Sequence, residues 1–117
     1  TASGDVANKI GTYLKALAAY DNGIPFYSAF PVSTFDMSIE RPDQITIEER
    51  DGDEVRMIEG LVVASSQPET ASVLISPAEM PVSNFGFDVT PARLLSGIIT
   101  DRGICAADRE SILKLLA

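Results

Sequence analysis

The sequence contains no histidine and only one cysteine, Cys105, among its 117 residues. Without histidine, the chain lacks the commonest general base at neutral pH and the commonest metal ligand. A self-contained Ser-His-Asp triad, a zinc protease site and a two-histidine iron site are therefore excluded. A single cysteine cannot form an internal disulfide, which fits a reducing compartment.

Cationic residues are also scarce, with 9 Lys and Arg against 17 Asp and Glu and a formal net charge of -8. Nucleic acids and anionic membrane surfaces attract proteins through cationic side chains, so we expect neither as a partner. No apolar run is long enough to cross a bilayer, and no charged and then apolar leader opens the chain. The content of 45% hydrophobic residues is ordinary for a globular protein, and the length allows one domain or part of one.

The first predicted element is a helix. Apolar residues recur at spacings of three and four and predict a helix over residues 6–20. Ser3 and Asp5 are candidate N-caps, and Gly23 suits the left-handed position that ends a helix. Gly11 lies inside this helix at a cost of roughly 1 kcal/mol, which suggests close packing on a sheet.

The middle of the chain favours strands and loops. The aromatic-rich run 24–30 predicts a strand directly after the first helix. Residues 55–58 are compatible with a short strand. The apolar runs 61–63 and 73–75 are compatible with a peripheral hairpin within the region of about 60–83.

The last third of the sequence predicts two more helices. The first covers residues 92–99, with Thr90 as its N-cap and Pro91 at its first position. Asp108 caps the second, which contains four apolar residues, namely Ile112, Leu113, Leu115 and Leu116.

A helix, a tight turn and a buried strand form the repeating unit of a parallel α/β sheet. Such a sheet is covered by helices on both faces. Three helices and one central strand are too few for a doubly wound sheet. We therefore predict an α/β chain that is part of a larger domain, with its missing strands on a preceding segment, on another chain, or on both.

The opening segment is the main candidate site. Gly4 allows a ligand to approach the backbone closely, and a helix N-terminus binds phosphate through its unpaired N–H groups. Asn8 would supply an amide donor and Lys9 a positive charge to such an anion. The alternative is that Lys9 is solvated on an exposed helix face.

Several other residues have a chemical and a structural interpretation. Cys105 is a possible nucleophile, but its apolar neighbours favour an unreactive thiol. Thr1 is either an N-terminal nucleophile or an arbitrary chain end. The run 48–50 (Glu-Glu-Arg) either binds a substrate hydroxyl or forms a loop ion pair. Asp36 and Asp88 are most simply turn and cap residues.

Four stretches, taken together and in order, resemble the methylthioribose-1-phosphate isomerase family. They are TASGDVANKIGTY at 1–13, NGIPFY at 22–27, IEER at 47–50, and FDVTPAR at 87–93 followed by ITDRGI at 99–104. The last stretch is similar also to the regulatory alpha, beta and delta subunits of the guanine-nucleotide exchange factor for eukaryotic translation initiation.

The resemblance implies that residues 1–117 are the C-terminal segment of a Rossmann-like domain with a parallel sheet. It implies an aldose–ketose isomerase that converts 5-methylthioribose 1-phosphate to 5-methylthioribulose 1-phosphate in methionine salvage. Such an enzyme is expected to be a cytoplasmic homodimer that uses no metal and no organic cofactor.

The resemblance also carries over to particular residues. Asn8 and Lys9 match the family's substrate-contacting pair. The catalytic cysteine and aspartate of the family lie upstream of Thr1, so Cys105 and Asp5 do not correspond to them. We therefore expect the isolated chain to be inactive without its upstream segment. The alternatives are a non-catalytic regulatory subunit that senses a phosphorylated ligand, and an isomerase of another pentose phosphate.

Overall fold

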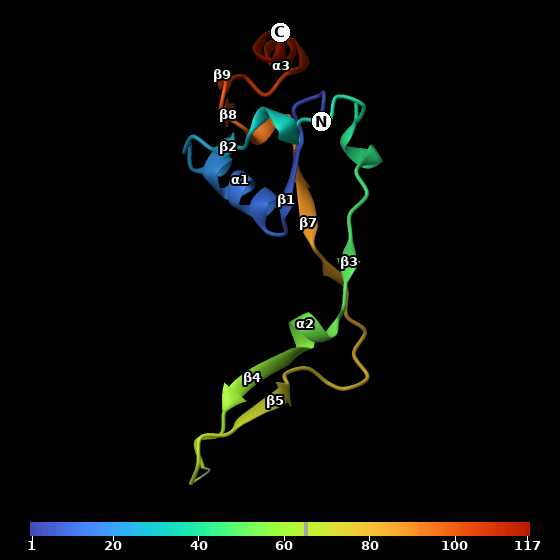
Figure 1. The fold of residues 1–117 in the computed structure, drawn as a ribbon, viewed down its shortest axis with the longest axis vertical. Helices are drawn as coiled ribbons and strands as arrows, with labels where there is room; N and C mark the ends of the chain where they lie inside the picture. The colour runs from blue at the N-terminus through green and yellow to red at the C-terminus, as the bar shows by residue number, and fades with distance from the viewer. Residues whose placement is uncertain (65) are drawn as a thin grey trace. The chain divides into compact units, whose positions relative to one another are not determined.

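The computed structural model describes residues 1–64 and 66–117 (Figure 1). They form two compact units, which we call the main unit (residues 1–47 and 87–117) and the hairpin unit (residues 48–86). The main unit contains β1 (Val6–Lys9), α1 (Thr12–Asp21), β2 (Tyr27–Ala29), η1 (Val32–Thr34), η2 (Pro42–Gln44), β7 (Phe87–Thr90), η3 (Ala92–Leu94), β8 (Gly97–Thr100), β9 (Gly103–Cys105) and α3 (Arg109–Leu116), where η marks a 3-10 turn. The hairpin unit contains β3 (Glu49–Arg50), α2 (Asp53–Arg56), β4 (Met57–Leu61), β5 (Thr70–Leu74) and β6 (Asn84–Phe85).

The strands of the main unit form two small sheets. β1 pairs antiparallel with β7, and Val6 lies opposite Thr90. β2 pairs parallel with β8, which in turn pairs antiparallel with β9. The described residues therefore form a mixed α/β structure with one parallel strand pair, and their strands are divided among small sheets.

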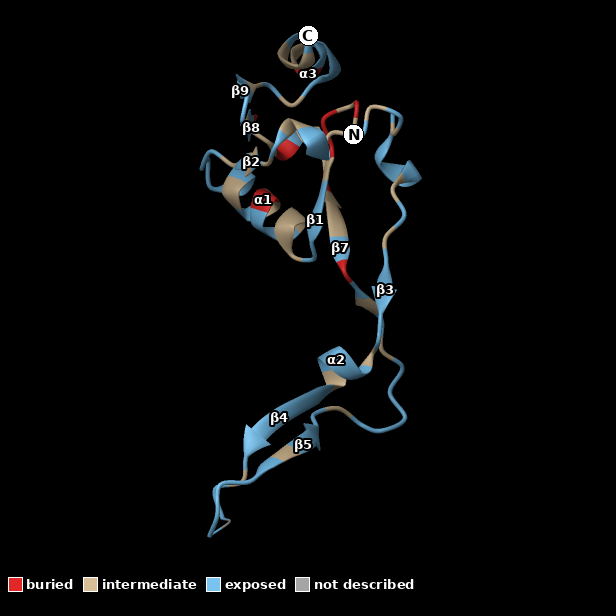
Figure 2. Ribbon diagram, in the orientation of Figure 1, coloured by how far each residue is buried: buried red, intermediate tan, exposed pale blue. Residues whose placement is uncertain are grey.

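The buried core of the main unit is small. Its fully buried or nearly buried apolar residues are Ala2, Ala16, Leu94, Ile98 and Ile112. Figure 2 shows buried segments near the N-terminus and in α1. Much larger apolar side chains remain exposed, including Leu14 at 70% and Ile104 at 67%.

The helix predicted over residues 6–20 is wrong in its first half. Val6–Lys9 is strand β1, and α1 begins only at Thr12. The reason is the backbone of Gly11, whose φ of 99° is left-handed, so no helix runs through this position. Asp5 is consequently not the cap of this helix. The predicted end is confirmed, because Gly23 adopts the left-handed φ of 65° directly after α1.

The helix predicted over residues 92–99 is also wrong. One 3-10 turn covers Ala92–Leu94, and Gly97–Thr100 is strand β8. The β-branched residues of β8 suit a central strand, and its pairing on both sides with β2 and β9 overrides the helix-like spacing of the apolar residues. Thr90 belongs to strand β7 and is not a helix cap.

The strands predicted in the middle of the chain are shifted in the structure. The strand predicted over 24–30 is present only as β2 (Tyr27–Ala29). Residues 55 and 56 belong to the short helix α2, and β4 starts at Met57. A hairpin is present in the hairpin unit, formed by β4 and β5 with Met57 opposite Leu74.

The final helix is confirmed, with its cap. The Asp108 carboxylate accepts hydrogen bonds from the Ser111 amide at 2.8 Å and from the Ser111 hydroxyl at 3.0 Å. Ile112 on the inner side of α3 is fully buried. Among the residues described, no helix is long and apolar enough to cross a membrane.

The cap of α3 predicts a pH-dependent effect. The hydrogen bonds from the Ser111 amide and hydroxyl hold the pKa of Asp108 below its usual value. The stabilisation is therefore complete above the unfolded-state pKa of about 4 and is lost as the pH falls through the lower pKa of the folded state. An Asp108→Ala variant should melt at a lower temperature than the wild type at pH 7.

Thermal melts at a series of pH values check this prediction. The wild-type and Asp108→Ala midpoints should converge as the medium is acidified, whereas the exposed control Glu79→Ala should track the wild type throughout. A gap between wild type and Asp108→Ala that stays constant down to low pH would contradict the assigned role of the carboxylate.

Candidate functional site

Asn8 and Lys9 are the last two residues of β1, directly before the turn at residues 10–11 that leads into α1, and both are exposed. The prediction that they lie in the first turn of a helix is therefore wrong. Successive side chains of a strand point to opposite faces of the sheet. Asn8 therefore shares a face with its cross-strand partner Asp88, and Lys9 shares the other face with Phe87. The predicted role of Asn8 and Lys9 in binding substrate stays a prediction.

The start of α1 is occupied by the carboxylate of Asp88. Its two oxygens accept hydrogen bonds from the Gly11 amide at 2.6 Å and the Tyr13 amide at 3.1 Å. The interpretation of Asp88 as a cap is confirmed, although the helix that it caps lies far away in the sequence. Because a carboxylate neutralises the positive end of α1, the phosphate site predicted at a helix N-terminus is not formed by these two amides.

The turn between β1 and α1 is fixed by a further contact. The Thr12 hydroxyl donates a hydrogen bond to the Lys9 carbonyl oxygen at 2.7 Å. Together with the left-handed Gly11, this bond fixes the backbone directly after Lys9. α1 packs beside β7, so the strand pair and the helix hold the Asn8–Lys9 end in place (Figure 1).

Gly4 serves packing within the chain. Its φ is 92°, and a Cβ at this position would lie 2.4 Å from the Ala107 carbonyl oxygen. The close approach predicted for a ligand is thus made by the segment before α3. The neighbouring Asp5 is only 9% exposed and accepts hydrogen bonds from the Ser3 hydroxyl at 2.5 Å and the Ala92 amide at 3.0 Å.

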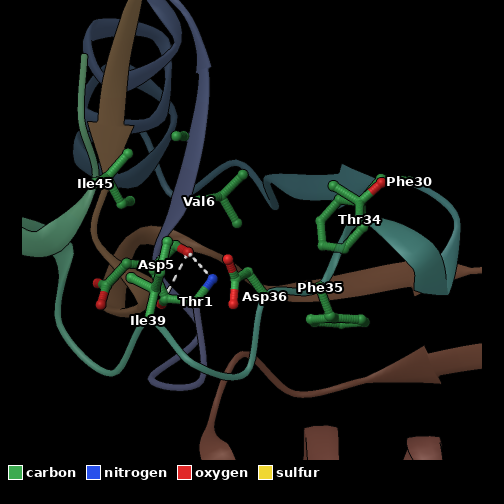
Figure 3. A pocket seen from close by; sticks show the side chains of 10 residues that line it. Thr1, Asp5, Val6, Phe30, Thr34, Phe35, Asp36, Ile39 and Ile45 are labelled. Atoms are coloured by element: carbon green, nitrogen blue, oxygen red, sulfur yellow. Dashed lines mark hydrogen bonds between the residues drawn. The ribbon is translucent and has the colours of Figure 1, made fainter.

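A cavity of about 140 Å³ lies next to this loop (Figure 3). Most of its wall is apolar, and its charged side chains are the carboxylates of Asp5 and Asp36. Neither Asn8 nor Lys9 lines it. An apolar wall with two carboxylates and no cationic side chain does not suit a phosphate. The lining residues are Thr1, Asp5, Val6, Ala7, Phe30, Thr34, Phe35, Asp36, Ile39 and Ile45.

Asp36, at the rim of this cavity, is confirmed as a turn residue. Its carboxylate accepts hydrogen bonds from the Ser38 hydroxyl at 2.5 Å and the Ser38 amide at 2.9 Å. The hydroxyl and then the amide lower the pKa of Asp36, so it is a carboxylate at neutral pH. Thr1 is likewise bound within its own loop, because its hydroxyl is 2.9 Å from the Ser3 hydroxyl.

The remaining candidates have structural surroundings. Burial raises the pKa of the Cys105 thiol, which favours the interpretation of Cys105 as an unreactive residue.

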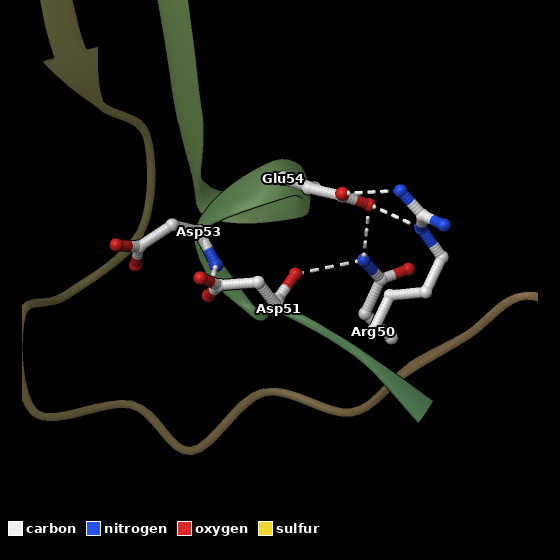
Figure 4. Close-up of polar contacts among 5 residues, drawn as sticks. Arg50, Asp51, Asp53 and Glu54 are labelled. Atoms are coloured by element: carbon white, nitrogen blue, oxygen red, sulfur yellow. Dashed lines mark hydrogen bonds and ion pairs between the residues drawn. The ribbon is translucent and has the colours of Figure 1, made fainter. Parts of the chain in front are cut away.

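In the hairpin unit, the Arg50 guanidinium forms two hydrogen bonds with the Glu54 carboxylate, at 2.6 and 2.8 Å (Figure 4). The ion-pair interpretation of the run 48–50 is thus confirmed for Arg50, with a partner outside the run. Within the described residues, no three His, Cys, Asp or Glu side chains could hold a metal ion.

Comparison with known proteins places this arrangement in a family. The sequence model of the Initiation factor 2 subunit family matches residues 1–107. The chain belongs to this family. One relative, the methylthioribose-1-phosphate isomerase of Sulfurimonas denitrificans, is 55% identical over 113 residues, which are 96% of this chain and 31% of the relative.

Two solved structures resemble the chain closely. The 5-methylthioribose 1-phosphate isomerase of Pyrococcus horikoshii OT3 has a TM-score of 0.79 at 41% identity, covering 98% of this chain and 29% of that one. The delta subunit of translation initiation factor eIF-2B from A. fulgidus has a TM-score of 0.76 at 32% identity. This match covers 96% of the present chain and 29% of the delta subunit. The chain thus spans about a third of the length of the proteins that it matches.

Sequence reasoning missed the carboxylates that join distant parts of this site. Asp5 binds the start of η3, and Asp88 binds the start of α1. Local sequence offered one usable signal, the glycine at position 11, which marks a break between a strand and a helix. The partner of each aspartate lies more than 70 residues away, so no local pattern points to it.

The Asp88 contact predicts a loss of stability. An Asp88→Ala change leaves the Gly11 and Tyr13 amides without their acceptor and should cost about 1–2 kcal/mol in the free energy of unfolding. Asp88→Asn keeps one acceptor oxygen and should cost less. Denaturant unfolding measures both, with Asp43→Ala as the control, because Asp43 forms only an exposed ion pair with Arg41. Equal costs for Asp88→Ala and Asp43→Ala would contradict the anchoring role.

The packing of Gly4 predicts a second loss. A Gly4→Ala change places a methyl group against the backbone of Ala107 and requires a left-handed conformation, so either the loop or the segment before α3 must shift. The free energy of unfolding should fall by about 1–3 kcal/mol. A matched Gly60→Ala change meets no neighbouring atom and should have a smaller effect. A neutral Gly4→Ala variant would contradict the described packing.

Proposed function

We propose that this chain is the C-terminal segment of a methylthioribose-1-phosphate isomerase with a Rossmann-like domain. The observation that carries the proposal is the 55% identity to an isomerase over 96% of the chain. The likeness to a solved isomerase, with a TM-score of 0.79 at 41% identity, supports it independently. The complete enzyme converts 5-methylthioribose 1-phosphate to 5-methylthioribulose 1-phosphate in the cytoplasm and acts as a homodimer.

The chain depends on an upstream segment for its fold and its activity. Large apolar side chains such as Leu14 and Ile104 are exposed, and the parallel pair of β2 and β8 needs further strands to form a Rossmann-like sheet. The matched relatives are about three times as long as this chain. The resemblance to the isomerases implies that the catalytic cysteine and aspartate lie upstream, so we expect the 117-residue chain alone to be inactive.

The reaction moves hydrogen between C1 and C2 of the sugar after the ring has opened. It requires an acid, a base and a group that holds the phosphate in one place. Lys9 is suited to hold the phosphate, since its side chain is exposed and has no ion-pair partner among the residues described. Asn8, from the opposite face of the strand, adds an amide donor.

The geometry of the strand end supports one position for the phosphate in this proposal. Asn8 and Lys9 leave opposite faces of the sheet, so a phosphate that contacts both lies beyond the end of β1, over the turn to α1. The Asp88 carboxylate at the start of α1 repels an anion, which favours binding on the Lys9 side. No metal or organic cofactor takes part in this proposal.

A regulatory subunit is the alternative function. The delta subunit of eIF-2B from A. fulgidus shares the structure of this segment, with a TM-score of 0.76. Such a protein would bind a phosphorylated ligand without turning it over. The lower identity of 32%, against 41% for the solved isomerase, favours the enzyme.

Turnover by the full-length protein that contains this segment tests the proposal. It should isomerise 5-methylthioribose 1-phosphate, and Lys9→Ala should raise KM by about 10- to 100-fold, the value of a charge-assisted hydrogen bond to phosphate. The control is Lys114→Ala, which removes an exposed lysine of α3 and should leave KM unchanged.

Two results would contradict this account in different ways. An unchanged KM in the Lys9→Ala variant would remove Lys9 from the phosphate site but leave the isomerase assignment intact. Binding of a phosphorylated ligand without any turnover by the wild type would favour the regulatory alternative. A panel of other pentose phosphates identifies the preferred sugar.

A further inference from the structure

The turn between β1 and α1 (Figure 1) carries a second lysine besides Lys9, namely Lys15 in the first turn of α1. Side chains of an α-helix lean toward its N-terminus, so a residue at this position reaches back over the turn. A Cβ built at Gly11 would lie 3.7 Å from the Lys15 Nζ. Apart from the adjoining residues 10 and 12, no other atom of the described residues lies within 4 Å of that point. The space over Gly11 is therefore open except for one ammonium group.

Lys9 lies within reach of the same space. Consecutive Cα atoms are about 3.8 Å apart, so the Cα atoms of Lys9 and Gly11 are at most about 7.6 Å apart. A lysine carries its ammonium on a flexible four-carbon side chain with three donors. One phosphate over Gly11 can therefore accept hydrogen bonds from both Lys9, at the end of β1, and Lys15, on α1.

The charges around the turn show what Lys15 adds. The Asp88 carboxylate at the start of α1 and the Lys9 ammonium carry opposite unit charges, which sum to zero. Lys15 makes this sum positive. No atom of Asp88 lies within 4 Å of the Cβ position at Gly11, so the carboxylate does not fill the space that the Lys15 ammonium faces. The repulsion of a phosphate by Asp88 is thus offset only when Lys15 is present.

The two lysines of this turn differ from most arginines of the chain. Neither the Lys9 ammonium nor the Lys15 ammonium has a hydrogen-bond or ion-pair partner within residues 1–64 and 66–117. A lysine in the first turn of a helix also opposes the positive end of the helix dipole, and this first turn contains no acidic residue. Both observations favour an anion as the partner of Lys15. The arginines that form ion pairs with carboxylates are Arg41, Arg50, Arg56 and Arg109.

We propose that Lys15 is a further substrate-binding residue, and that its ammonium holds the C1 phosphate of the sugar over Gly11 together with Lys9. This inference rests on the proposed function, because it adds a residue to the phosphate site described there. Lys9 binds the phosphate from the strand end, and Lys15 binds it from the helix. A phosphate held from two elements keeps C1 and C2 of the open sugar in one place during proton transfer.

Binding to the full-length protein tests the role of Lys15. Isothermal titration calorimetry measures the affinity for 5-methylthioribulose 1-phosphate and, separately, for inorganic phosphate. Lys15→Ala should weaken both affinities about 10-fold, the value of one charge-assisted hydrogen bond. Lys15→Arg keeps the positive charge and should retain more of the affinity than Lys15→Ala. The control Lys114→Ala changes the net charge equally but lies on α3, and it should leave both affinities unchanged.

Three outcomes would overturn the proposal. Unchanged affinities in Lys15→Ala would leave Lys15 as a cation that only balances the Asp88 carboxylate, whether or not the variant melts at a lower temperature. Equal losses in Lys15→Ala and Lys114→Ala would assign the effect to net charge and not to a contact. A wild-type protein that binds neither 5-methylthioribulose 1-phosphate nor inorganic phosphate would remove the phosphate site altogether.

A failure of the isomerase assignment gives a different result. A protein that does not isomerise the sugar, but loses phosphate affinity in Lys15→Ala, would reject the isomerase and retain the role of Lys15. A protein that isomerises the sugar, with unchanged affinities in Lys15→Ala, would retain the isomerase and reject the role of Lys15.

Discussion

The contact on which the main unit depends is the bond between the Asp88 carboxylate and the start of α1. Asp88 lies on β7, directly opposite Asn8 of β1, and its oxygens accept from the amides of Gly11 and Tyr13. One side chain therefore joins both strands to the helix and orients the turn that follows Lys9. An aspartate is well suited to this task, because its charge also complements the positive end of the helix.

Other aspartates of the main unit also bind the amides at the starts of helical segments. Asp5 binds the first amide of η3 at Ala92, Asp101 binds the first amide of η1 at Val32 at 2.7 Å, and Asp108 caps α3. Carboxylates thus satisfy the unpaired amides at the starts of four helical segments. Part of the strongly acidic composition is explained by this use of aspartate. In the hairpin unit, by contrast, the acidic residues outnumber the arginines that pair with them.

Local sequence signals predicted the helix ends that are fixed by residues close to them in the sequence. These signals failed for strands that pair with strands far away in the sequence. The cap of α3 by Asp108 and the stop at Gly23 are local and were correct. Residues 6–9 and 92–99 have helix-like apolar spacing, but β1 pairs with β7 and β8 pairs with β2, about 70–80 residues away. Long-range pairing overrides weak local preference. The resemblance predicted the family correctly, whereas the position of Asn8 and Lys9 on a strand followed from no local pattern.

A crystal structure of the full-length protein with 5-methylthioribose 1-phosphate bound tests the central claim most directly. The account predicts a phosphate oxygen about 2.8 Å from Lys9 Nζ, beyond the end of β1, with the Gly11 and Tyr13 amides still bound to Asp88. A phosphate bound elsewhere, with Lys9 facing solvent, would contradict it.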